Sequence, residues 1–240
     1  MSIFHYTDSL LRAAVMTLKL CAFGAVAGTA WGLVVGLLRA SSFRPLRWLA
    51  ALYTSVLRGV PILIVLLFTY YGLPLAMPNL RFSAYICGAI GLTLFVGAYV
   101  AEAVRGGLES VPTGQTEAAQ ALGLSNFQRL RLVMLPQAVR VIVPPWIGIL
   151  LALVKETSLV SVVGLVELTR AGRVVGQESN NTLAAFALVA LVYFVICWPI
   201  GQFGRWYEHR LAASGLRTVH EPAVSNLLGE DAEVPTGGAA

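Results

Sequence analysis

The chain has 240 residues, of which 57% are hydrophobic and only 12% are charged, and its mean hydropathy is +0.75. Water-soluble domains carry roughly a quarter of charged residues, so this composition excludes an ordinary globular protein and predicts a membrane protein. No basic run with interleaved aromatic residues suggests nucleic-acid binding. We therefore interpret the net charge of +5 as a signal of orientation in the membrane.

Five stretches are apolar over the length that a membrane-spanning helix needs, which is about 20 residues. We expect spans at 18–38, 59–77, 83–104, 137–165 and 183–204, within a single transmembrane domain over residues 1–210. Pro144-Pro145 interrupts the fourth span and predicts a kink, because two backbone donors are missing. Residues 211–240 show little periodicity and are predicted to be a loose tail. The expected fold class is an all-α membrane protein.

The first two spans carry distinct local signals. Glycine recurs at every fourth residue of the first span, at Gly24, Gly28, Gly32 and Gly36. This spacing predicts a smooth strip on which a neighbouring helix packs closely, although glycine is common in membrane helices in general. Pro61 is tolerated in the first turn of the second span, where no donor is needed. The preceding stretch Phe43–Leu57 alternates aromatic and basic residues and could lie along the membrane interface.

The orientation follows from the basic residues between the spans. The richer segments hold Arg39, Arg44, Arg47 and Arg58; then Arg105, Arg129, Arg131 and Arg140; and finally Arg205, Arg210 and Arg217. The alternate loops hold only Arg81, Arg170 and Arg173. With five spans, the N-terminus is expected outside the cell and the C-terminus in the cytoplasm, so the loop 112–136 is expected to be cytoplasmic.

That loop contains the amphipathic stretch Thr116–Pro136, TEAAQALGLSNFQRLRLVMLP. We expect one helix over Glu117–Leu122 with Glu117 in its first turn, ended by Gly123. A second helix begins at a capping box of Ser125 and Gln128, and Leu135-Pro136 is expected to close it and turn the chain back into the membrane. Two short helices cannot bury their apolar faces alone. The loop is therefore either a surface that another protein binds or a membrane-surface hairpin.

Ionisable residues inside a span are candidates for function, because a charge in hydrocarbon is costly. Lys155, Glu156, Thr157 and Ser158 are expected midway along 146–165 and are candidates for a substrate path. Lys155 could assist the carboxylate of an amino acid and Glu156 its ammonium group. The structural alternative is an ion pair or hydrogen-bond network that locks spans together.

A second charged group lies nearer the cytoplasmic end of the third span. Glu102 is a further candidate for the substrate path, but its spacing from Arg105 favours structural pairing. Arg58 is interpreted as an interface anchor or as a partner of Glu102. His5, His209 and His220 are scattered, so neither a catalytic nor a metal site is predicted.

The chain has no G-x-x-x-x-G-K-[ST] phosphate-binding loop, so any ATPase that drives it is expected to be a separate polypeptide and no cofactor of its own is expected. Five spans are few for a closed path, which indicates a pair of such chains, identical or related, around a central route. The alternative is a self-contained carrier or channel driven by an ion gradient through Lys155, Glu156 and Glu102. A third class, an intramembrane enzyme, would need a nucleophile beside a base, and for that role the sequence offers only Ser158 and Ser161 near Lys155.

Several motifs in order resemble those of permease subunits of bacterial ATP-driven (ABC) importers, more narrowly the polar amino-acid type that carries histidine, glutamine, arginine or glutamate. They cover roughly residues 15–210: Arg58-Gly59-Val60-Pro61; Gly97-Ala98-Tyr99 with Glu102 and Arg105-Gly106-Gly107; Gly114-Gln115-Thr116-Glu117-Ala118-Ala119 with Gly123; Leu135-Pro136-Gln137-Ala138; and Lys155-Glu156-Thr157-Ser158-Leu159. Gly148 stands where relatives usually carry Asn, so a role of that Asn cannot be transferred.

The resemblance implies a type I importer fold in the bacterial inner membrane, with an EAA loop that couples to the ATPase. The coupling residues it implies are Glu117, Ala118, Ala119, Leu122, Gly123, Leu135 and Pro136; Arg58, Gly59, Pro61 and Arg105 are expected to be structural. The implied partners are a cytoplasmic ATPase dimer that uses ATP and Mg²⁺, a second identical or homologous permease, membrane lipid, an external binding protein and its amino-acid substrate.

Overall fold

The computed structural model describes residues 6–213, apart from the side chain of residue 212, and this part of the chain is helical without strands. The α-helices are α1 (Thr7–Arg39), α2 (Arg44–Gly59), α3 (Ile62–Leu67), α4 (Leu73–Ala76), α5 (Ala84–Glu109), α6 (Thr113–Ala121), α7 (Asn126–Gln128), α8 (Leu135–Glu156), α9 (Leu168–Glu178) and α10 (Thr182–Ala213). Two π-helical segments, Phe68–Gly72 and Arg129–Met134, and the 3₁₀ helix Thr157–Val163 lie between them.

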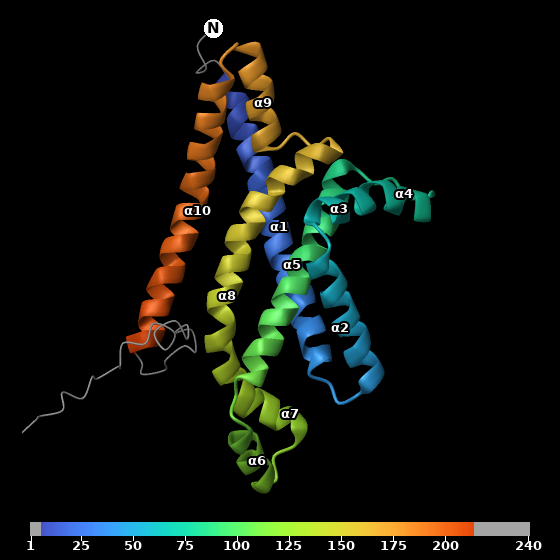
Figure 1. Cartoon of the computed structure of the whole chain (residues 1–240), viewed down its shortest axis with the longest axis vertical. Helices are drawn as coiled ribbons and strands as arrows, with labels where there is room; N and C mark the ends of the chain where they lie inside the picture. Colours follow the sequence, from blue (N-terminus) through green and yellow to red (C-terminus); the bar gives the residue numbers. More distant parts are fainter. Residues whose placement is uncertain (1–5, 214–240) are drawn as a thin grey trace, which may run out of the picture.

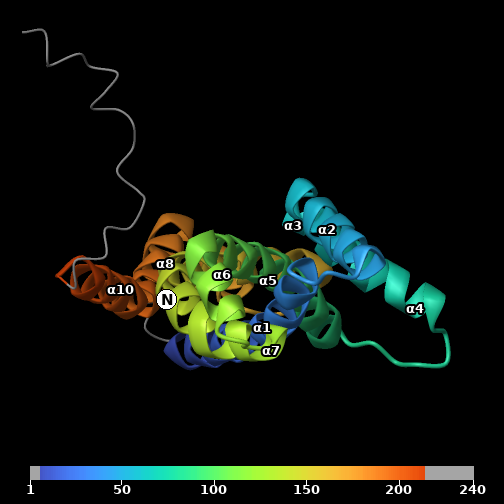
Figure 2. The ribbon, with the colours of Figure 1, turned by 90° about the horizontal axis from the view of Figure 1, so that it is seen from below.

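Four long helices, α1, α5, α8 and α10, form the body of the molecule (Figure 1). Within the described residues, four helical stretches are long and apolar enough to cross a membrane, and a bent pair formed by Arg44–Gly59 and Ile62–Ala76 would make a fifth span. Seen from below, the body is a flattened row with α10 at one edge and α4 at the other (Figure 2). The expected all-α membrane fold with about five spans is confirmed.

The glycine strip of α1 packs against α5, as predicted. A Cβ on Gly28, Gly32 or Gly36 would lie 2.6, 2.5 or 2.7 Å from the Cβ of Val96, Val100 or Val104, respectively. Such distances are too short for real carbon atoms, so each position requires glycine for this approach. Gly24 lies farther along the strip, where a Cβ would be 3.2 Å from Leu153 Cδ1 of α8. The strip therefore brings α1 into contact with two neighbouring spans.

The second span lies where it is predicted. Helical structure runs from Ile62 to Ala76, within the predicted 59–77 and with Pro61 at its start, and the chain bends by 108° between α2 and this segment. The cause is Pro61: a residue before proline avoids the helical region, and Val60 is extended with φ −100° and ψ 134°. As a helix, Ile62–Ala76 extends only about 22 Å, which is short of the hydrocarbon thickness. The stretch 43–57, expected along the interface, forms α2 and packs against α1 and α5 through the buried Ala50.

The fourth span begins before the end of the predicted loop 112–136. Helical structure runs without a break from Asn126 to Val163, so Leu135-Pro136 does not turn the chain and Pro144-Pro145 does not end the helix. A π turn over Arg129–Met134 widens the helix just before Pro136, where the proline ring would otherwise crowd the preceding turn. Prolines are tolerated in membrane helices when neighbouring groups satisfy the freed carbonyls. The span ends at Gly164, which has φ 94°.

The outer spans are longer than their apolar cores. Helix α1 begins at Thr7 rather than residue 18, and α10 extends to Ala213 rather than 204. Polar residues continue these helices beyond the apolar segment; Arg12 Nη2, for example, lies 2.7 Å from Asp8 Oδ2, one turn away. Residues 211–213 of the predicted tail are thus helical, and residues 214–240 lie outside the described part.

Candidate functional site

The loop between α5 and the fourth span is a pair of helices about a glycine turn. Gly123 adopts the left-handed conformation with φ 80°, and Ser125 caps the second helix. The Gln128 amide donates to Ser125 Oγ at 3.3 Å, and the Ser125 amide donates to Gln128 Oε1 at 2.9 Å. The glycine end and the capping box are therefore confirmed. The first helix starts earlier than predicted, at Thr113 after Pro112, so Glu117 is not in its first turn.

The loop projects from one end of the molecule (Figure 1), and it exposes apolar side chains. Leu122 is 82% exposed and Phe127 is 68% exposed, whereas Ala119 is buried. A Cβ on Gly123 would meet no atom within 4 Å, so its surroundings are open. Arg129 Nη1 donates to Gln120 Oε1 at 2.8 Å and joins the two helices. The helix pair therefore presents a partly apolar surface that no other part of the described chain covers.

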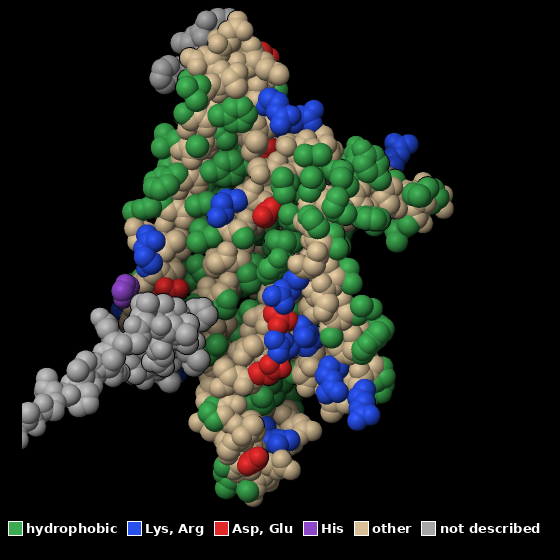
Figure 3. Space-filling view, viewed as in Figure 1, with side chains coloured by type: hydrophobic (Ala, Val, Ile, Leu, Met, Phe, Trp, Pro, Cys, Tyr) green, Lys and Arg blue, Asp and Glu red, His purple; other side chains and the backbone are tan. Residues whose placement is uncertain are grey.

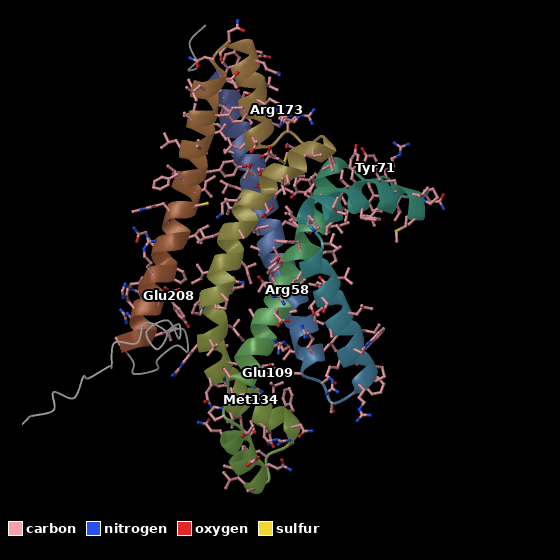
Figure 4. All side chains as sticks on the ribbon, viewed as in Figure 1. Arg58, Tyr71, Glu109, Met134, Arg173 and Glu208 are labelled. Atoms are coloured by element: carbon pink, nitrogen blue, oxygen red, sulfur yellow. The ribbon has the colours of Figure 1, made fainter. Side chains whose placement is uncertain are left out.

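The other predicted coupling residues lie on both sides of this surface. Glu117 and Ala118 are exposed on α6, Leu135 is half-buried, and Pro136 is exposed at the start of α8. The labelled Met134, just before them, lies where α8 meets the helix pair (Figure 4). The continuous helix through this junction connects the exposed loop directly to the fourth span.

Glu102 is the centre of an ion cluster that joins three helices. Its Oε2 pairs with Arg39 of α1 and lies 3.4 Å from Arg58 Nη1 at the end of α2, while its Oε1 pairs with Arg105 one turn along α5. Arg58 also lies over the Tyr99 ring at 5.5 Å. The expected Glu102–Arg105 pair and the Arg58 contact are therefore present. Gly59 and Pro61 follow Arg58 in the sequence, at the bend between α2 and the second span.

The polar group Lys155–Ser158 lies at the junction of two kinds of helix. Lys155 and Glu156 end α8, and Thr157 and Ser158 begin the 3₁₀ segment. Lys155 is exposed and Glu156 half-buried, and neither side chain forms a hydrogen bond or ion pair with any residue in the described part. Thr157 is fully buried and donates to the Val154 carbonyl at 2.7 Å. The charged side chains therefore do not lock described spans together.

Gly148 lies on an open part of α8. It is exposed, and a Cβ there would meet no atom within 4 Å. Because seven residues make nearly two helical turns, Gly148 and Lys155 share a face of α8. A side chain at this position would project into the same open region as Lys155.

A buried carboxylate was missed by the sequence reasoning. Glu167 is completely buried and caps α9, accepting the amides of Thr169 and Arg170 at 2.9 and 2.8 Å. Tyr193 of α10 donates its hydroxyl to Glu167 at 3.0 Å, and the Leu168 amide donates to Thr17 of α1 at 3.2 Å. This network fixes α9 to α1 and α10. The sequence signal that could have revealed this cap is a single acidic residue between Gly164, which ends a helix, and the start of the amphipathic helix α9.

Replacement of Glu167 by Gln is expected to destabilise the protein by about 2 kcal/mol, because an amide loses the charge and directs a donor towards groups that are themselves donors. The thermal unfolding midpoint of the purified protein in detergent would measure the loss. Replacement of the exposed Glu178, on the same helix, by Gln is the matched control and should leave the midpoint unchanged. Equal midpoints for both variants would contradict the prediction.

Comparison with known proteins covers most of the chain. Residues 28–213 match the model of the family described as binding-protein-dependent transport system inner membrane component. The probable amino-acid ABC transporter permease protein YckA of Bacillus subtilis (strain 168) is 40% identical over 203 residues, 85% of this chain and 89% of the relative. The arginine transport system permease protein ArtQ of the same organism is 33% identical over 205 residues, 85% of this chain and 93% of the relative.

Solved structures give the same result. A chain from the crystal structure of an amino acid ABC transporter with histidines is 32% identical and has a TM-score of 0.79, covering 87% of this chain and 96% of that one. A chain of the inward-facing MetNI methionine ABC transporter is 22% identical with a TM-score of 0.70, covering 86% of this chain and 99% of that one. The second likeness concerns the fold alone.

Proposed function

Because the chain belongs to the family of binding-protein-dependent transport system inner membrane components, and so is a membrane permease subunit of an ABC importer, we propose that it forms part of the path for a polar amino acid or a close analogue. The observation that carries the substrate class is the agreement of its relatives, which are named as amino-acid permeases, including arginine and glutamate/aspartate systems. The self-contained carrier is not favoured.

Coupling is assigned to the helix pair around Gly123. Its exposed Leu122 and Phe127, with the open space at Gly123, fit insertion into a cleft of a cytoplasmic ATPase dimer. The unbroken helix from Asn126 to Val163 would transmit a movement of this pair into the fourth span. ATP and Mg²⁺ would bind to the ATPase, and this chain would hold no cofactor. In the inner membrane, the loop and the C-terminus would then lie on the cytoplasmic side and the N-terminus on the outer side.

The substrate path is assigned to the open face of α8. Lys155 and Glu156 carry opposite charges without partners in the described chain, which suits the carboxylate and ammonium groups of an amino acid. Ser158 is half-buried beside them, whereas the buried Thr157 supports the helix transition. Glu102 is surrounded by arginines, so we assign it to holding α1, α2 and α5 together rather than to substrate.

One chain leaves this face open, so a second permease, identical or homologous, would close the path. An external substrate-binding protein would deliver the amino acid from the side of α9, opposite the helix pair (Figure 1). These partners follow from the family rather than from contacts in the described chain.

The function is tested by reconstituting the permease with its ATPase and binding protein in vesicles and measuring uptake of radiolabelled arginine, glutamine, histidine and glutamate. Uptake that requires ATP and persists with an uncoupler supports the proposal. Uptake by the permease alone that an uncoupler abolishes would instead show an ion-driven carrier.

Replacement of Glu156 by Gln is expected to lower the uptake rate at least about tenfold while the complex still assembles, because the charge that meets the substrate is lost without a change of shape. The size-exclusion profile of the purified complex and its uptake rate would be measured together. Replacement of the exposed Glu178 of α9 by Gln is the control. Wild-type uptake by the Glu156→Gln variant, or loss of folded protein, would contradict the path assignment.

A further inference from the structure

One end of the bundle carries an open, strongly basic hollow of about 440 Å³. Its walls come from the end of α1, the first half of α2 and the end of α5. The side chains that define it are Arg39, Arg44, Arg47, Trp48, Arg105 and Glu109. Figure 3 shows Lys and Arg side chains gathered over this region, and acidic side chains lie beside some of them but not beside the others.

The carboxylates at the hollow neutralise only some of its arginines. Glu102 pairs with Arg39 and Arg105, and Glu109 pairs with Arg105. Arg44 and Arg47 are exposed and form no ion pair with any residue from 6 to 213. The hollow therefore keeps an excess of positive charge at the two arginines of α2. Planar guanidinium groups in such a cluster suit a phosphate group, which they bind through paired hydrogen bonds.

An exposed apolar stripe lies on a neighbouring face of the same helix. Arg44, Arg47 and Trp48 share one face of α2, because residues three and four apart are neighbours on a helix. Beside this face run Leu49, Leu52 and Val56, which are 56%, 46% and 48% exposed. Trp48 itself is 64% exposed at the boundary, where tryptophan commonly marks the headgroup level of a bilayer. A basic hollow joined to an apolar stripe matches a headgroup joined to acyl chains.

We propose that this hollow binds the headgroup of an anionic phospholipid, with the phosphate at Arg44 and Arg47 and the acyl chains along Leu49, Leu52 and Val56. The bound lipid would supply the negative charge that the described chain does not provide at α2. It would also cover the apolar stripe, which a free phosphate ion would leave exposed. Basic pockets between membrane helices bind anionic headgroups in this way.

The test is native mass spectrometry of the purified, delipidated importer complex titrated with dioleoyl phosphatidylglycerol or with dioleoyl phosphatidylcholine. The wild type is expected to bind phosphatidylglycerol at least about tenfold more tightly. Each arginine near a charged lipid surface contributes enough to change affinity about fivefold, so the variant with both Arg44→Gln and Arg47→Gln should bind it roughly 25-fold more weakly. The charge-preserving variant with Arg44→Lys and Arg47→Lys should bind it with an affinity between those of the wild type and the Gln variant, because it keeps the charge but loses the paired hydrogen bonds.

The control carries Arg140→Gln and Arg205→Gln, which remove two exposed arginines of α8 and α10 outside the hollow. It should bind phosphatidylglycerol like the wild type. Equal loss in the control and the Arg44/Arg47 variant would overturn the site in favour of general attraction. Competition by inorganic phosphate without a preference for lipid would overturn it in favour of a soluble anion. Unchanged lipid binding with loss of the ATPase from the Arg44/Arg47 variant would show a protein interface instead.

Discussion

The variant Gly32→Val should fail to yield a stable, monodisperse permease. A Cβ at this position would lie 2.5 Å from Val100 Cβ and 2.8 Å from the Gly97 carbonyl oxygen, so the added atoms meet backbone as well as side chain. Overpacking a well-packed core costs about 1–3 kcal/mol, and a clash with backbone should reach or exceed the upper value because no rotamer relieves it. Size-exclusion profiles and thermal unfolding midpoints in detergent would measure the effect.

Two consecutive glycines of α5, Gly106 and Gly107, provide the matched control. A Cβ on Gly107 of α5 would lie 2.4 Å from Ile142 Cγ1 of α8, whereas one on Gly106 would meet no atom within 4 Å. Gly107→Val should therefore destabilise the protein like Gly32→Val, and Gly106→Val should not. If Gly32→Val unfolds at the wild-type temperature, or if Gly106→Val is as harmful as Gly107→Val, the close packing of these spans is not what stabilises the bundle.

The features that the sequence predicted well are local or depend on one residue type. The glycine strip, the left-handed Gly123 and the Ser125 capping box each follow from short-range chemistry, and each is present. The ion pair between Glu102 and Arg105 is likewise a neighbour relation along one helix. The addition of Arg39 from α1 could not be predicted, because it depends on how three helices cross.

The errors concern proline and helix ends. Pro136, which is expected to close a helix, lies inside continuous helical structure, whereas Pro61 stands at a helix start beside a sharp bend. The same residue type thus has opposite outcomes, because Pro61 stands at a helix start, whereas a π turn precedes Pro136 within the helix. Glu167 was missed for a related reason: its donors come from its own helix start and from Tyr193, which is distant in sequence.

The variant Gly123→Asp should leave the permease inserted and folded but abolish the stimulation of ATP hydrolysis by substrate. Gly123 has open space around it, so the side chain itself causes no clash within the described chain. Its φ of 80° costs an ordinary residue about 1 kcal/mol, which a local turn tolerates, and Asp is among the residues that adopt this conformation more readily. The larger effect would come from a charge placed beside Leu122, where the ATPase is proposed to contact the loop.

The measurement is ATP hydrolysis by the complex in lipid nanodiscs, with and without substrate-loaded binding protein, together with co-elution of the ATPase on size exclusion. Gly114→Asp is the control: it introduces the same side chain into open space on the same helix pair, at a position without a positive φ. Loss of stimulation in Gly123→Asp alone would place the contact at the turn, because a charge added elsewhere in the loop would then be insufficient to uncouple transport. Normal stimulation in Gly123→Asp would mean that the turn is not held by the ATPase, and the exposed Leu122 and Phe127 would then need a different partner.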